Sequence, residues 1–323
     1  MKSPALAIAV LLATWAVSAL IDVPQSDAAA NAPSFDMVRV TEGVSVIYGP
    51  LVLPDEHNRG FRNNVVVVDT GDGVVVFDPG GSAWAGEQVA AAINAISPAP
   101  VVAVFNSHAH GDHWLGNEGI RRVYPNVDIY GHPKMKARVE GSDGPQWLEQ
   151  IERLTKGSAN GHVVVAPTKT VVDGDEIVIG DTTFRIHHRG PAHTDNDIMI
   201  EIVEKRVLFT GDIVRNGLLG LMESDSSFAG NVAAIDALLA MDIKHYIPGH
   251  GKIGGKDAVT AYRTYLDTLL NQVRAHYAEG MADYEMKPAV NRALSSFSDW
   301  EGFSMRLGAH VSRAFLEVES EEF

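Results

Sequence analysis

The sequence predicts an α/β fold in which two β-sheets pack together and helices cover their outer faces. Three observations lead to this prediction: two groups of strand-like runs, a helical pattern after each group, and no Ser/Pro linker or low-complexity segment between them. The chain has 323 residues, of which 46% are hydrophobic and 21% charged, as in globular proteins that bury a full core.

Runs rich in valine and isoleucine, typical of buried strands, define the two groups. The first group consists of residues 44–48, 64–69, 74–78 and 101–105. The second group consists of residues 170–172, 177–179, 183–187, 198–203 and 207–210. Helical spacing of apolar residues covers 84–96, which stops before Pro98, and later 232–241 and 259–277.

A short pattern occurs once in each group. Residues 67–69 and 171–173 both read Val-Val-Asp, and a Gly-Asp pair and a further apolar run follow each. The repetition predicts a strand hairpin at both places and suggests that two β-rich halves are related.

Charge and cysteine content exclude several functions. There are 26 Lys+Arg against 41 Asp+Glu, a formal net charge of −15, which argues against nucleic acid as a partner. The chain contains no cysteine, which rules out disulfides, thiolate metal sites and a cysteine nucleophile.

Residues 1–30 have the pattern of an export signal peptide. Lys2 precedes an apolar run over 5–21, and three alanines at 28–30 offer a cleavage site. The run is about as long as the shortest membrane-spanning helices, so an uncleaved anchor is the alternative. We therefore expect a periplasmic or secreted protein with one domain over residues 31–323, and no stable membrane insertion after cleavage.

Residues 108–113 read His-Ala-His-Gly-Asp-His, directly after an expected strand. Such side chains need partners if buried, and crowded cationic rings repel one another, whereas a metal cation takes the nitrogen lone pairs. His108 and His110 lie on the same side of a non-helical backbone and can bind one ion. Asp112 and His113 then point elsewhere, so this loop can supply ligands to two ions.

Three further residues follow strand-like or short apolar segments, with glycine or proline nearby to turn the backbone. They are His193 in Gly-Pro-Ala-His-Thr-Asp, Asp212 in Thr-Gly-Asp, and His250 in Pro-Gly-His-Gly. A single residue of this kind is usually part of an ordinary turn or loop. All of them, in this order, are specific for a metal site.

With these residues the sequence resembles the metallo-β-lactamase superfamily over about 38–255. The resemblance implies an αββα sandwich, in which two mixed β-sheets pack face to face, and a site for two zinc ions. It also implies the ligands: His108, His110 and His193 for the first ion, Asp112, His113 and His250 for the second, and Asp212 between them. Imidazole and carboxylate ligands without sulfur suit zinc, and leave iron or manganese open.

The implied chemistry is attack of a metal-bound hydroxide on the carbonyl carbon of a small acyl substrate. Zinc lowers the pKa of bound water to about 7, which makes this nucleophile available at neutral pH. Asp112 and Asp212 are the expected catalytic residues, because Asp112 orients the nucleophile and Asp212 spans the ions with its two oxygens. An aspartate at position 212 is similar to hydroxyacylglutathione hydrolases and lactonases, while several β-lactamases have cysteine there.

Several residues near the motifs have two interpretations each. Asp78 and Asp195 either hold the outer N–H of ligating histidines or cap turns. Arg215 either binds a substrate carboxylate or forms a surface salt bridge. Phe61, in a loop over 49–62 that resembles a cover of the site, is either a substrate contact or a core aromatic.

Other segments remain open in the same way. Residues 218–222 form either a wall of the pocket or a loop anchor, and residues 280–323 pack as a helix or against a second subunit. The remaining histidines lack the context of a ligand and are interpreted as solvated or packed: His57, His132, His162, His187, His188, His245, His276 and His310.

The favoured function is a zinc hydrolase acting on a lactone, ester, thioester or β-lactam, with this small molecule as its partner. One alternative is an oxidoreductase with a single iron, as in the sulfur dioxygenases of the same superfamily. The other is an exported metal-binding accessory protein of a quinoprotein system. The complete set of ligands favours the enzyme over the accessory protein.

Overall fold

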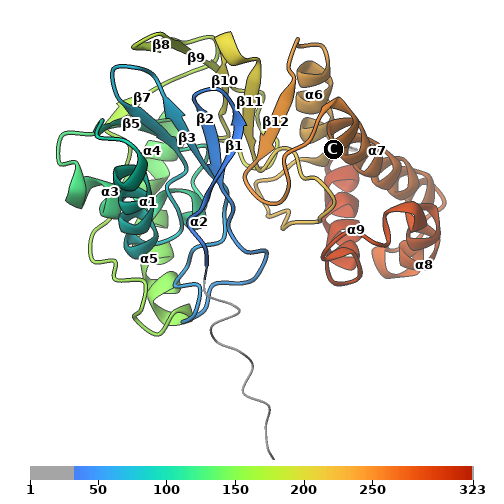
Figure 1. Ribbon diagram of the computed structural model, residues 1–323. Coiled ribbons are helices and arrows are strands. Elements are labelled where there is room, and N and C mark those ends of the chain that lie inside the picture. The colour runs from blue at the N-terminus through green and yellow to red at the C-terminus, as the bar shows by residue number, and fades with distance from the viewer. Residues whose placement is uncertain (1–32, 322–323) are drawn as a thin grey trace, which may run out of the picture.

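The computed structural model describes residues 33–321, which form two mixed β-sheets packed face to face with helices outside (Figure 1). The first sheet follows chain order and is antiparallel from β1 to β4 and parallel from β4 to β7. Its strands are β1 (Met37–Thr41), β2 (Val44–Ile47), β3 (Val65–Asp69), β4 (Val74–Phe77), β5 (Val101–Phe105), β6 (Asp128–Gly131) and β7 (Lys169–Thr170).

The second sheet has the order β12-β11-β10-β9-β8, with β11 and β12 parallel and the other pairs antiparallel. Its strands are β8 (Glu176–Ile179), β9 (Thr182–His187), β10 (Met199–Ile202), β11 (Val207–Gly211) and β12 (His245–Pro248). The predicted fold class, an αββα sandwich, is therefore confirmed.

Helices form the two outer layers, one on each sheet (Figure 1). On the side of the first sheet lie α1 (Ala83–Ile96), α2 (Gly111–Trp114), α3 (Asn117–Val123), α4 (Pro133–Glu140) and α5 (Asp143–Leu154). On the side of the second sheet lie α6 (Phe228–Leu239), α7 (Lys256–Ala278), α8 (Asp283–Ala293) and α9 (Phe303–Ser320). Two short 3-10 helices, η1 (Val203–Lys205) and η2 (Ser295–Phe297), complete the described elements.

The strands are apolar on both sides because both faces of each sheet are covered. In β4, Val75 and Phe77 face the second sheet, whereas Val74 and Val76 face α1. The Phe77 ring lies 5.8 Å from that of Phe184 in β9, measured between ring centroids, so aromatic side chains join the two sheets. This packing fixes how the sheets face each other, and thereby how their strand ends meet.

One of the two predicted hairpins is wrong. Strands β3 and β4 pair antiparallel as expected. However, β7 pairs with β6 in the first sheet and β8 pairs with β9 in the second. The second Gly-Asp turn therefore carries the chain between the sheets, because each strand beside it finds its partner elsewhere in the chain.

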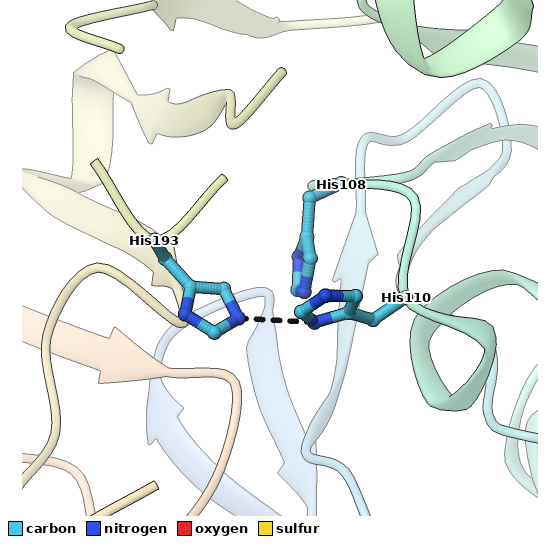
Figure 2. A group of neighbouring side chains, drawn as sticks. All are labelled: His108, His110 and His193. Carbon is cyan, nitrogen blue, oxygen red and sulfur yellow. Dashed lines mark hydrogen bonds between the residues drawn. The ribbon is translucent and has the colours of Figure 1, made fainter. Parts of the chain in front are cut away.

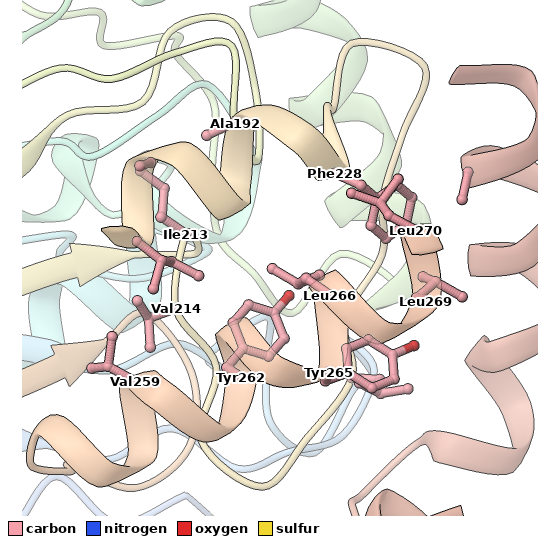
Figure 3. Packing of buried hydrophobic residues seen from close by; sticks show 14 of the residues in the cluster. Ala192, Ile213, Val214, Phe228, Val259, Tyr262, Tyr265, Leu266, Leu269 and Leu270 are labelled. Atoms are coloured by element: carbon pink, nitrogen blue, oxygen red, sulfur yellow. The ribbon is translucent and has the colours of Figure 1, made fainter. Parts of the chain in front are cut away.

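The C-terminal segment packs as helices within this chain, which is one of the two alternatives predicted for residues 280–323. Helices α8 and α9 bury Met286, Val290 and Val311 in one core with α6 and α7. Figure 3 shows part of that core, to which Phe228 of α6 and Leu266 and Leu270 of α7 belong. The sequence predicted neither α8 and α9 nor β1, β6 and α3 to α5.

The expected export signal, residues 1–30, lies outside the described residues. Among the helices that the structure describes, each is too short or too polar to cross a bilayer.

Candidate metal centre

The ends of neighbouring strands deliver most of the predicted ligands to one edge of the sandwich. His108 follows β5 in the first sheet, while Asp212 and His250 follow the parallel strands β11 and β12 in the second. Asp112 and His113 lie in the first turn of α2, immediately after the site loop. Both sheets therefore contribute, and their face-to-face packing brings the two sets together.

His110 and His193 come from loops. His110 directly precedes α2, and His193 lies between β9 and β10. Figure 2 shows the rings of His108, His110 and His193 turned toward a common point. His193 Nε2 lies 3.1 Å from His110 Nδ1. The structure thus brings together all seven residues that the sequence singled out as ligands.

These residues form three overlapping groups whose ligand atoms lie within 4.8 Å of one another. The groups are His108, His110 and His193; His108, His113 and Asp212; and Asp112, His113 and His250. The middle group shares a histidine with each of the others. Asp212 therefore stands between them, with Oδ2 at 3.5 Å from His193 Nε2 and 3.6 Å from His250 Nε2.

Four buried atoms of the candidate ligands have no hydrogen-bond partner among the described residues: Nε2 of His108, Nε2 of His110, Nδ1 of His193 and Oδ1 of Asp212. A buried polar atom without a partner is costly, and native proteins rarely leave several in one place. A divalent cation accepts electron pairs from imidazole nitrogen and carboxylate oxygen alike. The atoms present therefore fit a metal ion, and assigning these residues as ligands stays a prediction.

Electrostatics prepare the rings for this role. Burial lowers the pKa of His108 and His193 well below the ordinary histidine value, so both rings are neutral and offer a lone pair. For Asp212, burial alone raises the pKa, but Arg215 and His250 outweigh it and hold the pKa well below its usual range. Asp212 is therefore a carboxylate, as a metal ligand must be.

Asp78 holds the His113 ring by a direct hydrogen bond and the His108 ring through the hydroxyl of Ser107. Its Oδ2 accepts hydrogen bonds from Nδ1 of His113 at 2.7 Å and from Oγ of Ser107 at 2.6 Å, and Ser107 Oγ in turn lies 2.9 Å from Nδ1 of His108. Asp78 is fully buried and follows β4 in a left-handed conformation, with φ of 50°. Of its two interpretations, the hydrogen bond to the outer nitrogen of a candidate ligand is confirmed, while the role of His113 as a ligand stays a prediction.

Asp195 does not have that role, and this interpretation is wrong. Its carboxylate accepts a bond from Asn196 Nδ2 at 2.9 Å and faces Lys134 and Arg138, each at 3.4 Å. It is partly exposed, because the loop turns this side chain outward while His193 turns inward. The same loop is held instead by Asn196, whose Oδ1 accepts from the backbone N–H of Ala109 at 2.9 Å.

Several residues that support the site carried no signal in the sequence. Arg62 donates from Nη1 to Asp112 Oδ2 at 3.2 Å, and its carbonyl oxygen lies 3.0 Å from His250 Nδ1. Asn64, fully buried, donates to the carbonyl oxygens of Pro248 at 2.8 Å and Gly251 at 2.7 Å. The contact of Arg62 with Asp112 spans 50 positions and the other three span more than 180, so only the tertiary structure reveals them.

Only a glycine fits at position 249, for a steric reason. A Cβ on this residue would collide with Oδ1 of Asp212 and come within 2.8 Å of Cε1 of His113. We expect Gly249→Ala to displace Asp212 and to weaken zinc binding, measured by metal content after dialysis. The control is Gly308→Ala in α9, where φ is not positive and a Cβ would come no closer than 4.0 Å to Lys287; equal losses in both variants would contradict this steric explanation.

Arg215 is not at the surface, so its interpretation as a surface salt bridge is wrong. Its side chain is 6% exposed and Nη2 donates to Asp212 Oδ2 at 2.7 Å. Gly220 makes room for the guanidinium, since a Cβ there would collide with it. The cation is therefore committed to the carboxylate between the two outer ligand groups, and nothing in the structure favours the other interpretation, a contact to substrate.

A buried ion pair that loses one partner leaves an uncompensated charge, at a cost of about 3–5 kcal/mol. We therefore expect Arg215→Met to lower the melting temperature of the metal-free protein. In the zinc-loaded protein the loss is expected to be smaller, because the metal neutralises Asp212. Calorimetry of both forms checks this, and equal losses in the two forms would speak against compensation by the metal.

For Phe61 and for residues 218–222, the structure favours a role in packing over contact with a substrate. Phe61 is fully buried and stacks on Phe35, so it is a core aromatic and not a substrate contact. Leu218 and Leu219 are buried and the segment pairs with Glu301, which makes it a loop anchor. None of the eight other histidines belongs to a metal-type group within residues 33–321.

His187 provides a check on the choice of histidines. Its Nε2 lies 2.9 Å from the carboxylate of Glu201, a neighbour within the second sheet. His187→Ala is expected to leave the zinc content unchanged, whereas His193→Ala is expected to reduce it. Elemental analysis of both variants decides: a halved zinc content in His187→Ala would mean that the wrong histidine was chosen.

Comparison with known proteins decides the family. The model of the metallo-β-lactamase superfamily matches residues 58–250, which include all seven candidate ligands. The chain belongs to this superfamily. Hydroxyacylglutathione hydrolases are similar to it: that of Francisella tularensis subsp. holarctica is 25% identical over 245 residues, which cover 73% of this chain and 81% of the relative. That of Nostoc sp. is 24% identical over 230 residues, 66% and 76% of the two chains.

Solved structures share the fold of this chain. A metallo-β-lactamase from Pontibacter korlensis matches 72% of this chain and 99% of its own, with a TM-score of 0.59 and 18% identity. The sec-alkylsulfatase Pisa1 from Pseudomonas sp. matches 90% of this chain and 51% of its own, with a TM-score of 0.67 and 16% identity. Superfamily membership and the hydrolase relatives together support an enzyme with a histidine-rich candidate metal site.

Proposed function

We propose that this superfamily member is a dinuclear zinc hydrolase that cleaves a small acyl substrate: a lactone, ester, thioester or β-lactam. The observation that carries the proposal is the position of Asp212 between two outer groups of three ligands each. Its Oδ2 lies within 3.6 Å of a histidine in each outer group, and a carboxylate that faces both groups is suited to a pair of cations.

Zinc bound in both groups supplies Lewis acidity and an acidified water with a pKa near 7. The chain's own residues then orient the reaction. Asp112 Oδ2 lies 3.2 Å from His250 Nε2 and 3.2 Å from Arg62 Nη1, which together fix the carboxylate at the second group. We propose that Asp112 orients the attacking water and takes up its proton. Asp78 keeps the rings of His113 and His108 in place while charge develops.

The test is metal analysis combined with a substrate panel. The purified chain, loaded with zinc, is expected to hold two zinc ions and to hydrolyse at least one class of acyl substrate. Thioesters deserve the first assays, because similar proteins are named hydroxyacylglutathione hydrolases. An alkyl sulfate belongs in the panel as well, since Pisa1 is a sec-alkylsulfatase.

Three outcomes would contradict the proposal. Inactivity on every acyl class would remove the hydrolase, and cleavage of the sulfate ester alone would replace the substrate class. A single iron per chain, with oxygen consumed on a persulfide, would indicate an oxidoreductase. Asp112→Asn is expected to keep the fold and the first zinc ion, but to weaken the second ligand group and lose turnover, because an amide supplies no anionic ligand oxygen and cannot take up a proton.

We also propose that the protein acts outside the cytoplasm, in the periplasm or after secretion, on this small molecule as its partner. The pattern of residues 1–30 supports this proposal. Cell fractionation with N-terminal sequencing of the mature chain tests it. An intact N-terminus in the cytoplasmic fraction would contradict it.

A further inference from the structure

The segment between β11 and α6, residues 212–227, is held by one face of the C-terminal helix α9. Arg313 donates to the carbonyl oxygens of Glu223 at 2.9 Å, Ser224 at 3.0 Å and Ser226 at 2.6 Å. His310 lies one turn earlier on the same helix, and its Nε2 is 2.8 Å from the carbonyl oxygen of Gly220. Residues three apart share a helix face, so α9 binds this segment along its length.

The same face continues to Glu317. Its carboxylate accepts from the backbone N–H groups of Phe228 at 2.7 Å and Ala229 at 2.9 Å, and from Ser227 Oγ at 2.9 Å. These are unpaired donors of the first turn of α6, and a carboxylate is favourable at a helix N-terminus. The start of α6, and with it the end of the segment, is thereby fixed by α9 as well.

The segment reaches the metal centre at Glu223. Its carboxylate Oε2 lies 3.7 Å from Nε2 of His110, and its backbone N–H donates to Ser226 Oγ at 2.9 Å. Ser226 Oγ donates in turn to the carbonyl oxygen of His193 at 2.6 Å. Glu223 and Ser226 therefore approach two of the three residues in the first ligand group.

Each candidate histidine ligand has an outer ring nitrogen, the one that faces away from the other ligands. Most of these nitrogens have an oxygen within hydrogen-bond distance, but those of His110 and His193 have none. Those of His108, His113 and His250 lie 2.7 to 3.0 Å from an oxygen of Ser107, Asp78 and Arg62 respectively. Nδ1 of His110 and Nε2 of His193 face each other, so their outer nitrogens are Nε2 and Nδ1 respectively, and both are buried without a hydrogen bond among the described residues. The carboxylate of Glu223 is the group in ion-pair range of Nε2 of His110.

We propose that Glu223 is a positioning residue that orients His110 for the first metal ion, and that Arg313 of α9 holds Glu223 in place. The inference rests on the proposed metal site but not on any substrate. A carboxylate behind a ligating histidine fixes its tautomer and ring orientation and strengthens metal binding. Helix α9 lies outside residues 58–250, which match the superfamily model. If Arg313 holds Glu223, a helix beyond the matched residues therefore takes part in building the site.

The first test measures zinc affinity by competition with a chromophoric chelator, together with the absorption spectrum of the cobalt-substituted protein. Glu223→Ala is expected to weaken the first zinc site by about 10- to 100-fold and to change the cobalt spectrum. Glu223→Gln is expected to recover part of the affinity, because its amide oxygen can accept a hydrogen bond from His110. The control is Glu319→Ala, an exposed glutamate on α9.

The second test asks whether Arg313 acts through Glu223. Arg313→Ala is expected to weaken the first zinc site, and to have no further effect in the Glu223→Ala background, since coupled residues are not additive. The control is Arg306→Ala, on the same helix, whose side chain makes no hydrogen bond in the described structure. Thermal unfolding of each zinc-loaded variant identifies any that do not fold.

The outcomes separate this inference from the proposed function. Unchanged zinc affinity and cobalt spectrum in Glu223→Ala would overturn the role of Glu223. Fully additive effects would overturn the link through Arg313. If the wild-type chain binds zinc but hydrolyses no substrate, the proposed function fails while the positioning role is still decided by these measurements; if it binds no zinc, both fail.

Discussion

Asp212→Asn is expected to leave one zinc ion per chain and to lower kcat/KM at least about 100-fold, while the fold survives. An asparagine still offers an oxygen that accepts a hydrogen bond from Arg215. It removes the negative charge that Asp212 places between the two outer ligand groups. A loss of about 3 kcal/mol of transition-state stabilisation corresponds to that factor. Elemental analysis and steady-state kinetics on whichever substrate the panel identifies measure both effects.

Asp299→Asn serves as the control, because this aspartate is exposed and makes no side-chain hydrogen bond or ion pair in the described residues. Asp212→Ala is the harsher variant: it leaves the buried guanidinium of Arg215 without its partner, which costs stability as well as metal. Combining Asp212→Ala with Arg215→Met is expected to restore the melting temperature but not the second zinc ion. Two zinc ions and full turnover in Asp212→Asn would show that the role between the ions is wrong.

Asp78→Asn is the second substitution with a large expected effect. Three donors converge on its carboxylate: the backbone N–H of Ser107 at 2.7 Å, the Ser107 hydroxyl at 2.6 Å and Nδ1 of His113 at 2.7 Å. An asparagine offers one oxygen and a competing N–H group, so a buried donor loses its acceptor at a cost of about 1–3 kcal/mol. His113 and His108 also lose their orientation, so zinc binding is expected to weaken by about 10- to 100-fold.

Chelator competition and calorimetry measure these two effects separately. Asparagine is the right replacement, since Asp78 has a positive φ that asparagine tolerates better than most residues. Asp69→Asn is a matched control: Asp69 ends the neighbouring strand β3, but it is exposed and accepts only from the backbone of Gly71. Unchanged affinity in Asp78→Asn would mean that the histidines are oriented by their packing alone.

The candidate ligands, which the structure brings together, could be singled out from the sequence because they belong to local signals. His108, His110 and His113 fall within one short motif, and the glycine or proline residues around Asp212 and His250 mark strand ends. The strand at 101–105 agrees residue for residue with β5, since a continuous apolar run bounded by a polar loop has few other interpretations.

The supports of the site could not be predicted in the same way. Asp78 and Asp195 both stand next to strand-like runs, yet one is fully buried behind His113 and the other partly exposed beside Lys134. Residue type and neighbours in the chain do not distinguish them, because burial depends on which sheet lies opposite. The same limit applies to Glu223, which has no motif around it.

The sequence by itself determined the two-sheet architecture and the identity of the seven candidate ligands, because hydrophobic periodicity and short metal motifs are properties of neighbouring residues. Only the tertiary structure decided that Arg215 is a buried partner of Asp212, that Asp195 faces outward, and that α9 reaches the centre through Arg313 and Glu223. Arg215 and Asp212 are only three positions apart, but their burial, like the contact of Arg313 with Glu223 over 90 positions, arises only when the sheets and helices pack.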